Sequence, residues 1–335
     1  MDRKLASIRK IEEIKPIQGA DKICAYRIGG WWVVDAVNKY SVGDLAVYYE
    51  IDSFLPTKPE FEFLRKNSYK KMPNGDEGFR LKTIKLRGQL SQGLLTKIPD
   101  NIINPKDGDD ITEVLGIVKY EPPIPVQLTG LVKGLFPSFI PKTDEIRVQN
   151  FESDTGLNVC GSMVYITEKL DGTSFTCYFN KGEFGVCSRN LELKETAENT
   201  HWSVANKMKL REKLSALGRN IALQGELCGT GIQKNMYRFN DQRVYFFTAY
   251  DIDSGSRLHF EELKDLISGL ELEMVPILDD LYRLPSENLV EKMLAYADGK
   301  SFFNNTVDRE GVVIRGLMED FSFKSISNNF LLKND

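Results

Sequence analysis

A proline-rich stretch near the middle of this 335-residue chain constrains its fold more than any other feature. Residues 121–141 read EPPIPVQLTGLVKGLFPSFIP. Proline lacks the N–H that a sheet ladder needs and breaks helices, so regular structure should stop here. A chain of this length is also too long for one typical core. We therefore predict a linker over 121–140 between two domains, residues 1–120 and 141–335.

The part before the linker is predicted to be a small β-barrel. Short alternating segments follow one another between residues 4 and 98, and turn signals such as Gly29-Gly30, Gly43-Asp44, Asn74-Gly75 and Gly88 separate them. The segments are SIRKIEEI, CAYRI, WWVVDAV, LAVYYEI and FRLKTIKL.

The part after the linker mixes strands and helices without strict alternation, which predicts an α+β domain with antiparallel sheets. The expected strands are MVYITEKL, SFTCYFN, EFGVCSR, IALQGEL, RVYFFTAYDI, GVVIRG and FSFKSIS. The expected helices are HWSVANKMKLREKLSAL, FEELKDLI and SENLVEKMLAYA.

Composition excludes several classes of protein. With 41% hydrophobic and 27% charged residues and no run of about 18 apolar residues, the chain is typical of a soluble globular protein. Its charged start, MDRKLASIRK, does not resemble a secretory signal, so we expect an intracellular, cytoplasmic protein. Five cysteines without a CxxC pair and two isolated histidines predict buried thiols rather than zinc ligation or disulfides. The net charge of −4 neither suggests nor excludes a nucleic-acid partner.

A lysine, an aspartate and a glycine in ITEKLDGTSFTCYF, residues 166–179, begin an ordered set of polar positions. One KxDG match can arise by chance, but four further segments follow it in order. They are CSRN, LQGELCGTGIQ, YFFTAYDI, and the pair EGVVIR and FSFK. The residues they contribute, with the first motif, are Lys169, Asp171, Gly172, Arg189, Glu226, Phe247, Tyr250, Glu310 and Lys324.

This ordered set resembles the motifs of the covalent nucleotidyltransferases, the superfamily of DNA ligases, RNA ligases and capping enzymes. The resemblance implies that Lys169 attacks the α-phosphate of ATP. A lysine must be neutral for this, although its usual pKa is about 10.4. Neighbouring carboxylates alone favour the charged amine, so a divalent cation must reverse their effect. Glu226, Glu310 and Asp171 are the expected ligands of Mg²⁺ or Mn²⁺.

The resemblance also assigns roles in nucleotide binding. Lys324 would neutralise charge on the α-phosphoryl group and act with Lys169 in catalysis. Tyr250 or Phe247 would stack on the purine, the alternative for the tyrosine being a core position. Glu168 would contact the edge of the base. Gly172 and Arg189 are expected beside the nucleotide.

The order of domains indicates which member of the superfamily this is. Lys324 lies 335 − 324 = 11 residues from the end, which leaves no room for the OB module that follows the catalytic domain in DNA ligases and capping enzymes. The front of the chain instead resembles the N-terminal OB domain of a group of ATP-dependent RNA ligases, in IRKIEEIKPIQGADKI, GWWVV, GDLAVYYEIDSFLP and FRLKTIKLRGQLSQGLL. The segment KTDEIRVQN resembles the same group, with Arg147 and Gln149 placed near the nucleotide.

The resemblance therefore implies an OB-fold barrel followed by an ATP-grasp-like ligase adenylation domain. The implied activity joins RNA 3′-OH and 5′-phosphate ends in RNA repair through lysyl-AMP and an adenylylated 5′ end. A nicked duplex is the expected substrate and a monomer the expected state, while single-stranded ends stay open. The rivals are an ATP-dependent DNA ligase and a non-catalytic nucleic-acid binder that keeps the fold.

The last motif and the cations of the front module each leave an alternative open. Many RNA ligases carry KxK in the last motif, but Ile326 stands where the second lysine would be, and Lys333 is a possible substitute. In the front module, four cations are candidates for RNA binding, the alternative being an ordinary polar strand face. By period two, the first pair should share one face and the second pair the opposite face, unless a bulge intervenes. The four are Arg80, Lys82, Lys85 and Arg87.

Overall fold

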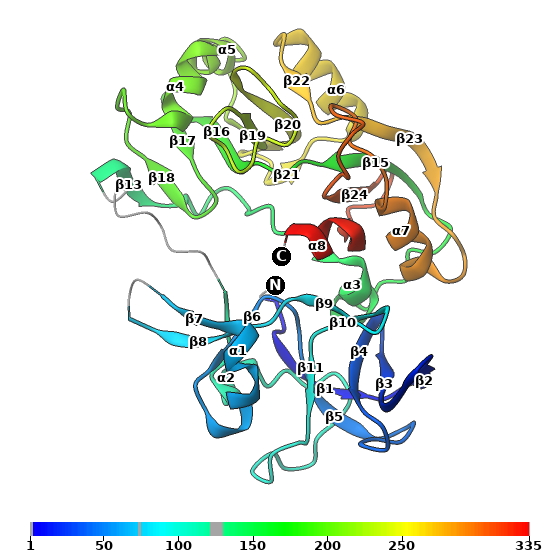
Figure 1. The fold of residues 1–335 in the computed structure, drawn as a ribbon. Coiled ribbons are helices and arrows are strands. Elements are labelled where there is room, and N and C mark those ends of the chain that lie inside the picture. Colours follow the sequence, from blue (N-terminus) through cyan, green and yellow to red (C-terminus); the bar gives the residue numbers. More distant parts are fainter. Residues whose placement is uncertain (1–2, 73–74, 121–129, 335) are drawn as a thin grey trace. The chain divides into compact units, whose positions relative to one another are not determined.

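A computed structural model describes residues 3–72, 75–120 and 130–334 of the protein. These residues divide into two compact units (Figure 1). The first unit contains the described residues up to 120 together with 148–158 and 331–334. The second unit contains 130–147 and 159–330. No helix among the described residues is long and apolar enough to cross a membrane.

The first unit is built mainly of short strands. Its strands are β1 (Ala6–Lys10), β2 (Glu13–Ile17), β3 (Ala20–Ile28), β4 (Trp31–Ala36), β5 (Leu45–Tyr49), β6 (Ser53–Pro56), β7 (Tyr69–Lys71), β8 (Glu77–Arg80), β9 (Thr83–Leu86), β10 (Gln89–Gln92), β11 (Leu94–Thr96) and β12 (Val118–Lys119). Its helices are the 3₁₀ turn η1 (Pro59–Leu64), α1 (Arg65–Ser68), α2 (Thr112–Leu115) and α3 (Val148–Thr155).

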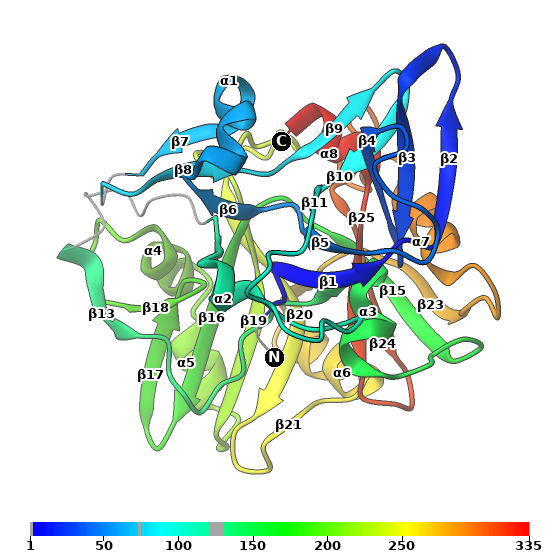
Figure 2. The ribbon, with the colours of Figure 1, turned by 90° about the horizontal axis from the view of Figure 1, so that it is seen from below.

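These strands pair antiparallel around one apolar core. The sheets have the orders β1-β5-β11, β2-β3-β4, β9-β10 and β12-β6-β8-β7 (Figure 2). Alternation places Ile8, Val47 and Leu55 inside with no exposed surface, so inward-facing side chains of separate sheets form the core.

Helix α3 is fixed to this unit by a buried polar network. Asn150 accepts a hydrogen bond from the Trp31 indole at 2.6 Å and donates one to Glu50 at 2.8 Å. Arg3 pairs with the same glutamate. A Cβ on Gly30 would lie 2.7 Å from the Cα of Gln149, so only glycine lets the helix approach this closely.

The second unit contains the longer sheets. Its strands are β13 (Val132–Leu135), β14 (Ile146–Arg147), β15 (Met163–Lys169), β16 (Thr173–Asn180), β17 (Glu183–Cys187), β18 (Leu191–Leu193), β19 (Ile221–Gly229), β20 (Gln242–Asp251), β21 (Ser256–Arg257), β22 (Glu273–Met274), β23 (Ile277–Arg283), β24 (Gly311–Gly316) and β25 (Ser322–Ile326). Its helices are α4 (Thr200–Lys207), α5 (Leu210–Ser215), α6 (Phe260–Gly269) and α7 (Leu289–Ala297). A last helix, α8 (Asn328–Asn334), ends the described chain.

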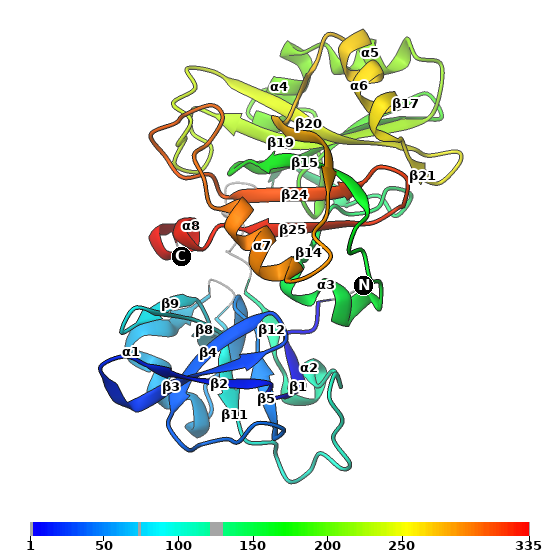
Figure 3. The ribbon, with the colours of Figure 1, turned by 90° about the vertical axis from the view of Figure 1, so that its right-hand side faces the viewer.

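Two sheets organise the second unit. One has the order β13-β18-β17-β16-β19-β20-β21, with β22 also pairing β20, and the other β14-β25-β24-β15-β23 (Figure 3). All pairs are antiparallel except β14 with β25 and β20 with β22. Helices α4, α5 and α6 cover one face of the first sheet, where Trp202, Leu214 and Leu263 join its core (Figure 1). The predicted antiparallel α+β character is confirmed in its main features.

Several predicted segments are broken or extended in the structure. SIRKIEEI divides into β1 and β2, and FRLKTIKL divides into β8 and β9. The predicted helix 201–217 breaks at Lys209, which takes a left-handed φ of 55° between α4 and α5. The predicted linker falls partly outside the described residues, at 121–129, and its remainder contains β13, which pairs with β18. All five cysteines are free thiols. Four of them are buried, as predicted, whereas Cys160 is exposed.

Candidate active site

Lys169 ends strand β15 at a tight turn against a neighbouring strand. A Cβ on Gly172 would lie 2.5 Å from the Leu227 carbonyl oxygen and 2.8 Å from the Glu226 side chain, so this position requires glycine. The Asp171 N–H donates to the Tyr237 hydroxyl at 2.6 Å. The turn is therefore held against β19 with the lysine at its edge.

Glu310 is the direct partner of the lysine. Lys169 lies opposite Gly311 in the β15–β24 register, so the residue before Gly311 reaches the same strand end. The Lys169 Nζ donates to Glu310 Oε1 at 2.5 Å, and the two side chains are 28% and 18% exposed. Residues 141 positions apart in the chain thus meet in one partly buried ion pair.

Two further carboxylates surround this pair. Burial raises the pKa of Glu226 to about 8, against the opposing effect of Lys169. Burial, with the charge of Glu310, raises the pKa of Asp171 to about 6. Burial lowers the pKa of the Lys169 amine, but the negative charges of Glu310 and Glu226 raise it by more, so the net shift is upward. The unliganded site therefore keeps the lysine as ammonium.

This electrostatic arrangement fits a hard divalent cation. Crowded carboxylates with raised pKa values are what a positive ion would stabilise, and oxygen is the ligand that Mg²⁺ and Mn²⁺ prefer. Among the residues that the structure describes, no group of three His, Cys, Asp or Glu is arranged to hold a metal by itself. A cation at Glu226, Glu310 and Asp171 would thus need other oxygen ligands, such as phosphate.

Glu168 is directed away from solvent, next to the lysine. It is 1% exposed, and its Oε2 accepts a hydrogen bond from the Phe302 N–H at 2.7 Å. Burial raises the pKa of this carboxyl. Its second oxygen, Oε1, is buried without a hydrogen-bond partner. A buried acceptor of this kind is costly unless a ligand satisfies it.

Lys324, Arg147 and Arg189 gather near one aspartate that the sequence reasoning missed. Arg189 bonds both carboxylate oxygens of Asp144 at 2.7 Å, and Lys324 Nζ lies 3.8 Å from one of them. Arg147 pairs with Lys324 in the parallel β14–β25 register. The structure therefore brings three predicted cations to one edge of the second sheet, with Asp144 between two of them. Ile326 is buried on the same strand.

The two aromatic candidates occupy different places. Phe247 packs with Leu170, the residue after the lysine, and the Arg315 guanidinium lies 5.4 Å from its ring centroid. Tyr250 lies opposite Ala222, at the other end of β19 from Glu226, and packs against Ile140. The geometry favours Phe247 as the aromatic beside the site.

Other predicted residues lie in the first unit. Gln149 is buried on α3 against Gly30, whereas Arg147, two residues earlier, belongs to the second unit. Arg80 ends β8 and bonds Asp52 at 3.0 Å, so its charge is already engaged.

The strand breaks between β8 and β9, so period two does not run through all four cations, and their role in RNA binding stays a prediction. Lys82 lies between these strands, Lys85 is on β9, and Arg87 lies in the turn after it with a φ of 49°. Lys85 and Arg87 are exposed.

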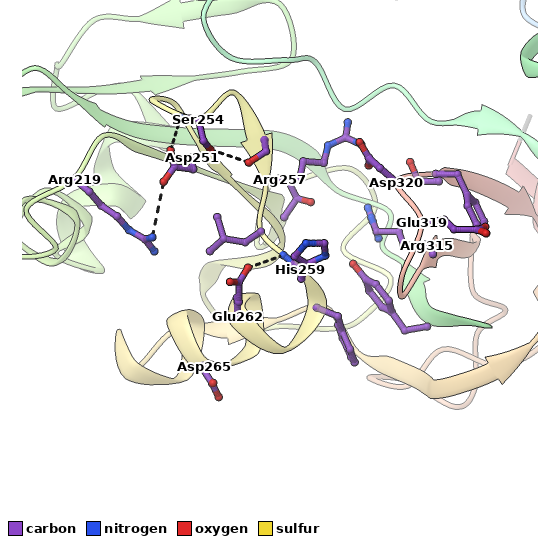
Figure 4. A pocket seen from close by; sticks show the side chains of 18 residues that line it. Arg219, Asp251, Ser254, Arg257, His259, Glu262, Asp265, Arg315, Glu319 and Asp320 are labelled. Carbon is purple, nitrogen blue, oxygen red and sulfur yellow. Dashed lines mark hydrogen bonds and ion pairs between the residues drawn. The ribbon is translucent and has the colours of Figure 1, made fainter. Parts of the chain in front are cut away.

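A cavity of about 690 Å³ lies at the opposite end of β15 from Lys169 (Figure 4). Tyr165 and Arg315, which pair across β15 and β24, contribute to its wall. Two of its charged groups, Arg219 and Asp251, pair at 4.0 Å. None of the residues predicted from the sequence lines it.

Comparison with known proteins explains this geometry. Residues 5–98 match an OB-fold domain family, and residues 162–326 match the family described as RNA ligase. A solved structure of Naegleria gruberi RNA ligase with pyrophosphate is 43% identical with a TM-score of 0.91, and the match covers 99% of each chain. The chain belongs to the RNA ligase family.

Two other structures of the Naegleria gruberi RNA ligase match this RNA ligase equally well. A lysine-to-alanine mutant with ATP and Mn is 42% identical, and a lysine-to-methionine mutant with AMP and Mn is 43% identical. Both have a TM-score of 0.91 and cover 99% of each chain. No match was found among curated proteins. The predicted OB-fold, the ligase domain after it and the family are confirmed.

Three residues that the sequence analysis did not single out form hydrogen bonds with motif residues. Tyr237, Asp144 and Phe302 lie in segments without periodic pattern, and their partners are distant in sequence. Only the position of Phe302 had a usable signal, because FFNN in a polar loop is an unusual place for aromatic side chains.

Proposed function

We propose that this RNA ligase uses ATP to join RNA 3′-OH and 5′-phosphate ends. In the first step the Lys169 amine attacks the α-phosphate of ATP, a P–N bond forms, the α–β P–O bond breaks and pyrophosphate leaves. In the second, the AMP passes to the RNA 5′-phosphate and frees the lysine. In the third, the 3′-OH attacks that phosphate and AMP leaves. The position of Lys169 among three carboxylates is the observation that carries the proposal.

The amine must lose its proton before the first step. Glu310 accepts the hydrogen bond from Lys169, so it is the group placed to guide that proton. Glu226, Glu310 and Asp171 would hold Mg²⁺ or Mn²⁺, and the relatives solved with ATP or AMP and Mn support this. Such an ion would offset the carboxylate charges and favour the neutral amine.

The remaining motif residues would bind the nucleotide. Lys324 and Arg189 would turn from Asp144 toward phosphate oxygens, where positive charge stabilises the transition state. Arg147, beside Lys324, and the turn at Gly172 would contact the same phosphates. Gln149 is proposed for this role from the sequence alone.

The base would bind in the interior. The unpartnered oxygen of Glu168 would accept the adenine amino group, and Phe247 would lie against the ring. Tyr250 stays the second candidate for stacking.

Transfer of label from radioactive ATP tests the proposal. With Mn²⁺ or Mg²⁺, wild-type protein should gain AMP on Lys169, and Lys169→Ala should lose labelling by at least about a thousandfold. Lys207→Ala, an exposed lysine on α4, is the matched control. Label on the alanine variant, or adenylate located on another side chain by mass spectrometry, would refute the nucleophile.

The proposed location is a reducing, intracellular compartment, where free thiols persist. The proposed substrate is a nicked duplex during RNA repair. Nicks whose 3′-OH strand ends in ribose or in deoxyribose test the choice of RNA. We expect faster sealing of the ribose end. Equal rates would favour a ligase that also acts on DNA.

A further inference from the structure

An exposed aromatic side chain lies on the segment that is hydrogen-bonded to the residue before the proposed nucleophile. Phe302 is 68% exposed, although its own N–H is bonded to Glu168, the neighbour of Lys169. Exposure alone does not mark a binding residue, but this ring is carried by a segment that is anchored at the site, so it is available to a ligand that binds there.

The ring is kept in place by its neighbours. Ser301, before it, is 2% exposed, and Phe303, after it, packs at 4.7 Å from Tyr245 and 5.1 Å from Phe239 between ring centroids. Phe302 lies edge-on to Phe303 at 5.5 Å. Because the residues on both sides are anchored, the Phe302 ring cannot turn into the core.

A loop over residues 230–239 borders the same rim. Gln233 donates to the Gly172 carbonyl oxygen at 3.0 Å, and Asn304 donates to the Met236 carbonyl oxygen at 2.8 Å. The loop is thus fixed both to the nucleophile turn and to the segment that carries Phe302. Lys234 and Arg238 are exposed on it. An aromatic face and two cations at one rim are the kinds of group that stack on nucleic-acid bases and contact their phosphates.

We propose that Phe302, Lys234 and Arg238 form a docking rim for the RNA end, an inference that rests on the proposed function. Phe302 stacks on a base next to the break, and the two cations contact phosphates of the same strand. The adenine of ATP is a poorer occupant, because the unpartnered acceptor of Glu168 is buried while the ring faces solvent. The rim therefore serves the second substrate.

Separate assays of the first and last steps test this inference. We expect Phe302→Ala to raise the KM for a pre-adenylylated nicked RNA at least about tenfold, with self-adenylylation by ATP falling less than about threefold. The variant keeps the backbone N–H that Glu168 needs. Phe302→Trp should restore sealing, whereas Phe302→Leu should not, since leucine keeps the apolar volume without a π-face. Leu281→Ala, 66% exposed on β23, is the matched control for both steps.

The cations provide a second measurement. In binding of nicked RNA followed by fluorescence anisotropy, Lys234→Ala and Arg238→Ala should each reduce the slope of log Kd against log salt by about one. This binding assay needs no adenylylation, so it tests the rim independently of the first step. If wild-type protein takes no label from ATP, that result contradicts the proposed function but not the rim.

Clear results would overturn the inference. Sealing by Phe302→Ala and Phe302→Leu at the wild-type KM would remove the stacking role. A KM for ATP that rises as much as the KM for RNA would place the ring on adenine instead. Unchanged salt slopes in both cation variants would remove Lys234 and Arg238 from the rim.

Discussion

The Lys169 site and the β9–β10 hairpin both present charged side chains near strand ends, but they hold them differently. Around Lys169 the groups are at least partly buried and bonded to segments far away in sequence, as with Glu310 at 2.5 Å. On the hairpin, Lys85 and Arg87 are exposed. Low polarity strengthens charge interactions in the first region, and water and salt weaken them in the second. The same residue types should therefore give large, specific effects in one region and small, salt-dependent effects in the other.

Glu226→Gln should show the largest effect after loss of the lysine itself. It removes one proposed metal ligand while keeping the shape of the side chain, so self-adenylylation should fall about a hundredfold. A higher Mn²⁺ concentration should restore part of the rate. Glu195→Gln, an exposed glutamate paired with Arg211, is the control. Near-normal labelling would show that Glu226 is not a metal ligand. It would also reduce the expected difference between substitutions at the Lys169 site and those on the hairpin.

Asn150→Ala tests whether a buried polar network in the first unit behaves like the Lys169 site. The change leaves the Trp31 N–H without its acceptor and Glu50 with one donor fewer, so the free energy of unfolding should fall by about 2 kcal/mol. Urea denaturation measures it. Glu152→Ala, exposed on the same helix, should cost less than about 0.5 kcal/mol. Equal losses in the two variants would contradict the anchoring role.

The pH dependence of stability gives an effect with a definite sign. The pKa of Glu226 is about 8 in the folded protein because of burial, and about 4.5 when unfolded. Between these two pH values the folded state binds more protons than the unfolded state. The contribution of Glu226 to the free energy of unfolding therefore falls as pH rises. Without nucleotide or metal, the free energy of unfolding of Glu226→Gln should rise relative to that of wild type by about 3 kcal/mol from pH 5.5 to pH 8. If the difference in unfolding free energy between the variant and wild type stays constant or falls with pH, the pKa of Glu226 is not raised in the folded protein.

The double variant Lys85→Ala with Arg87→Ala should have the smallest effect. If the hairpin contacts RNA phosphates, affinity should fall a few-fold at low salt and less at high salt. Self-adenylylation should stay at the wild-type rate, since neither residue is among the groups proposed to bind ATP. If the affinity for RNA is unchanged at every salt concentration, these two cations are solvated surface residues that do not contact RNA.

The ordered motifs predicted much of the candidate site because strand pairing brings motifs that are distant in the chain together. Lys169 and Glu310 meet since their strands, β15 and β24, pair in antiparallel register. Periodicity was less reliable for the surface cations. A break between β8 and β9 places Arg80 against Asp52 and leaves Lys82 outside both strands, and no pattern in FRLKTIKL marks that break.

Residue types and spacing alone predicted the family and the order of its domains, because the ordered motifs need particular groups at particular positions. The choice of Lys169 as the nucleophile stays a prediction from the same motifs. The tertiary structure decided which groups surround them. Asp144, Tyr237 and Phe302 contact the site through hydrogen bonds and packing between segments far apart in the chain. Such contacts depend on how sheets and loops pack, and local sequence carries no record of that packing.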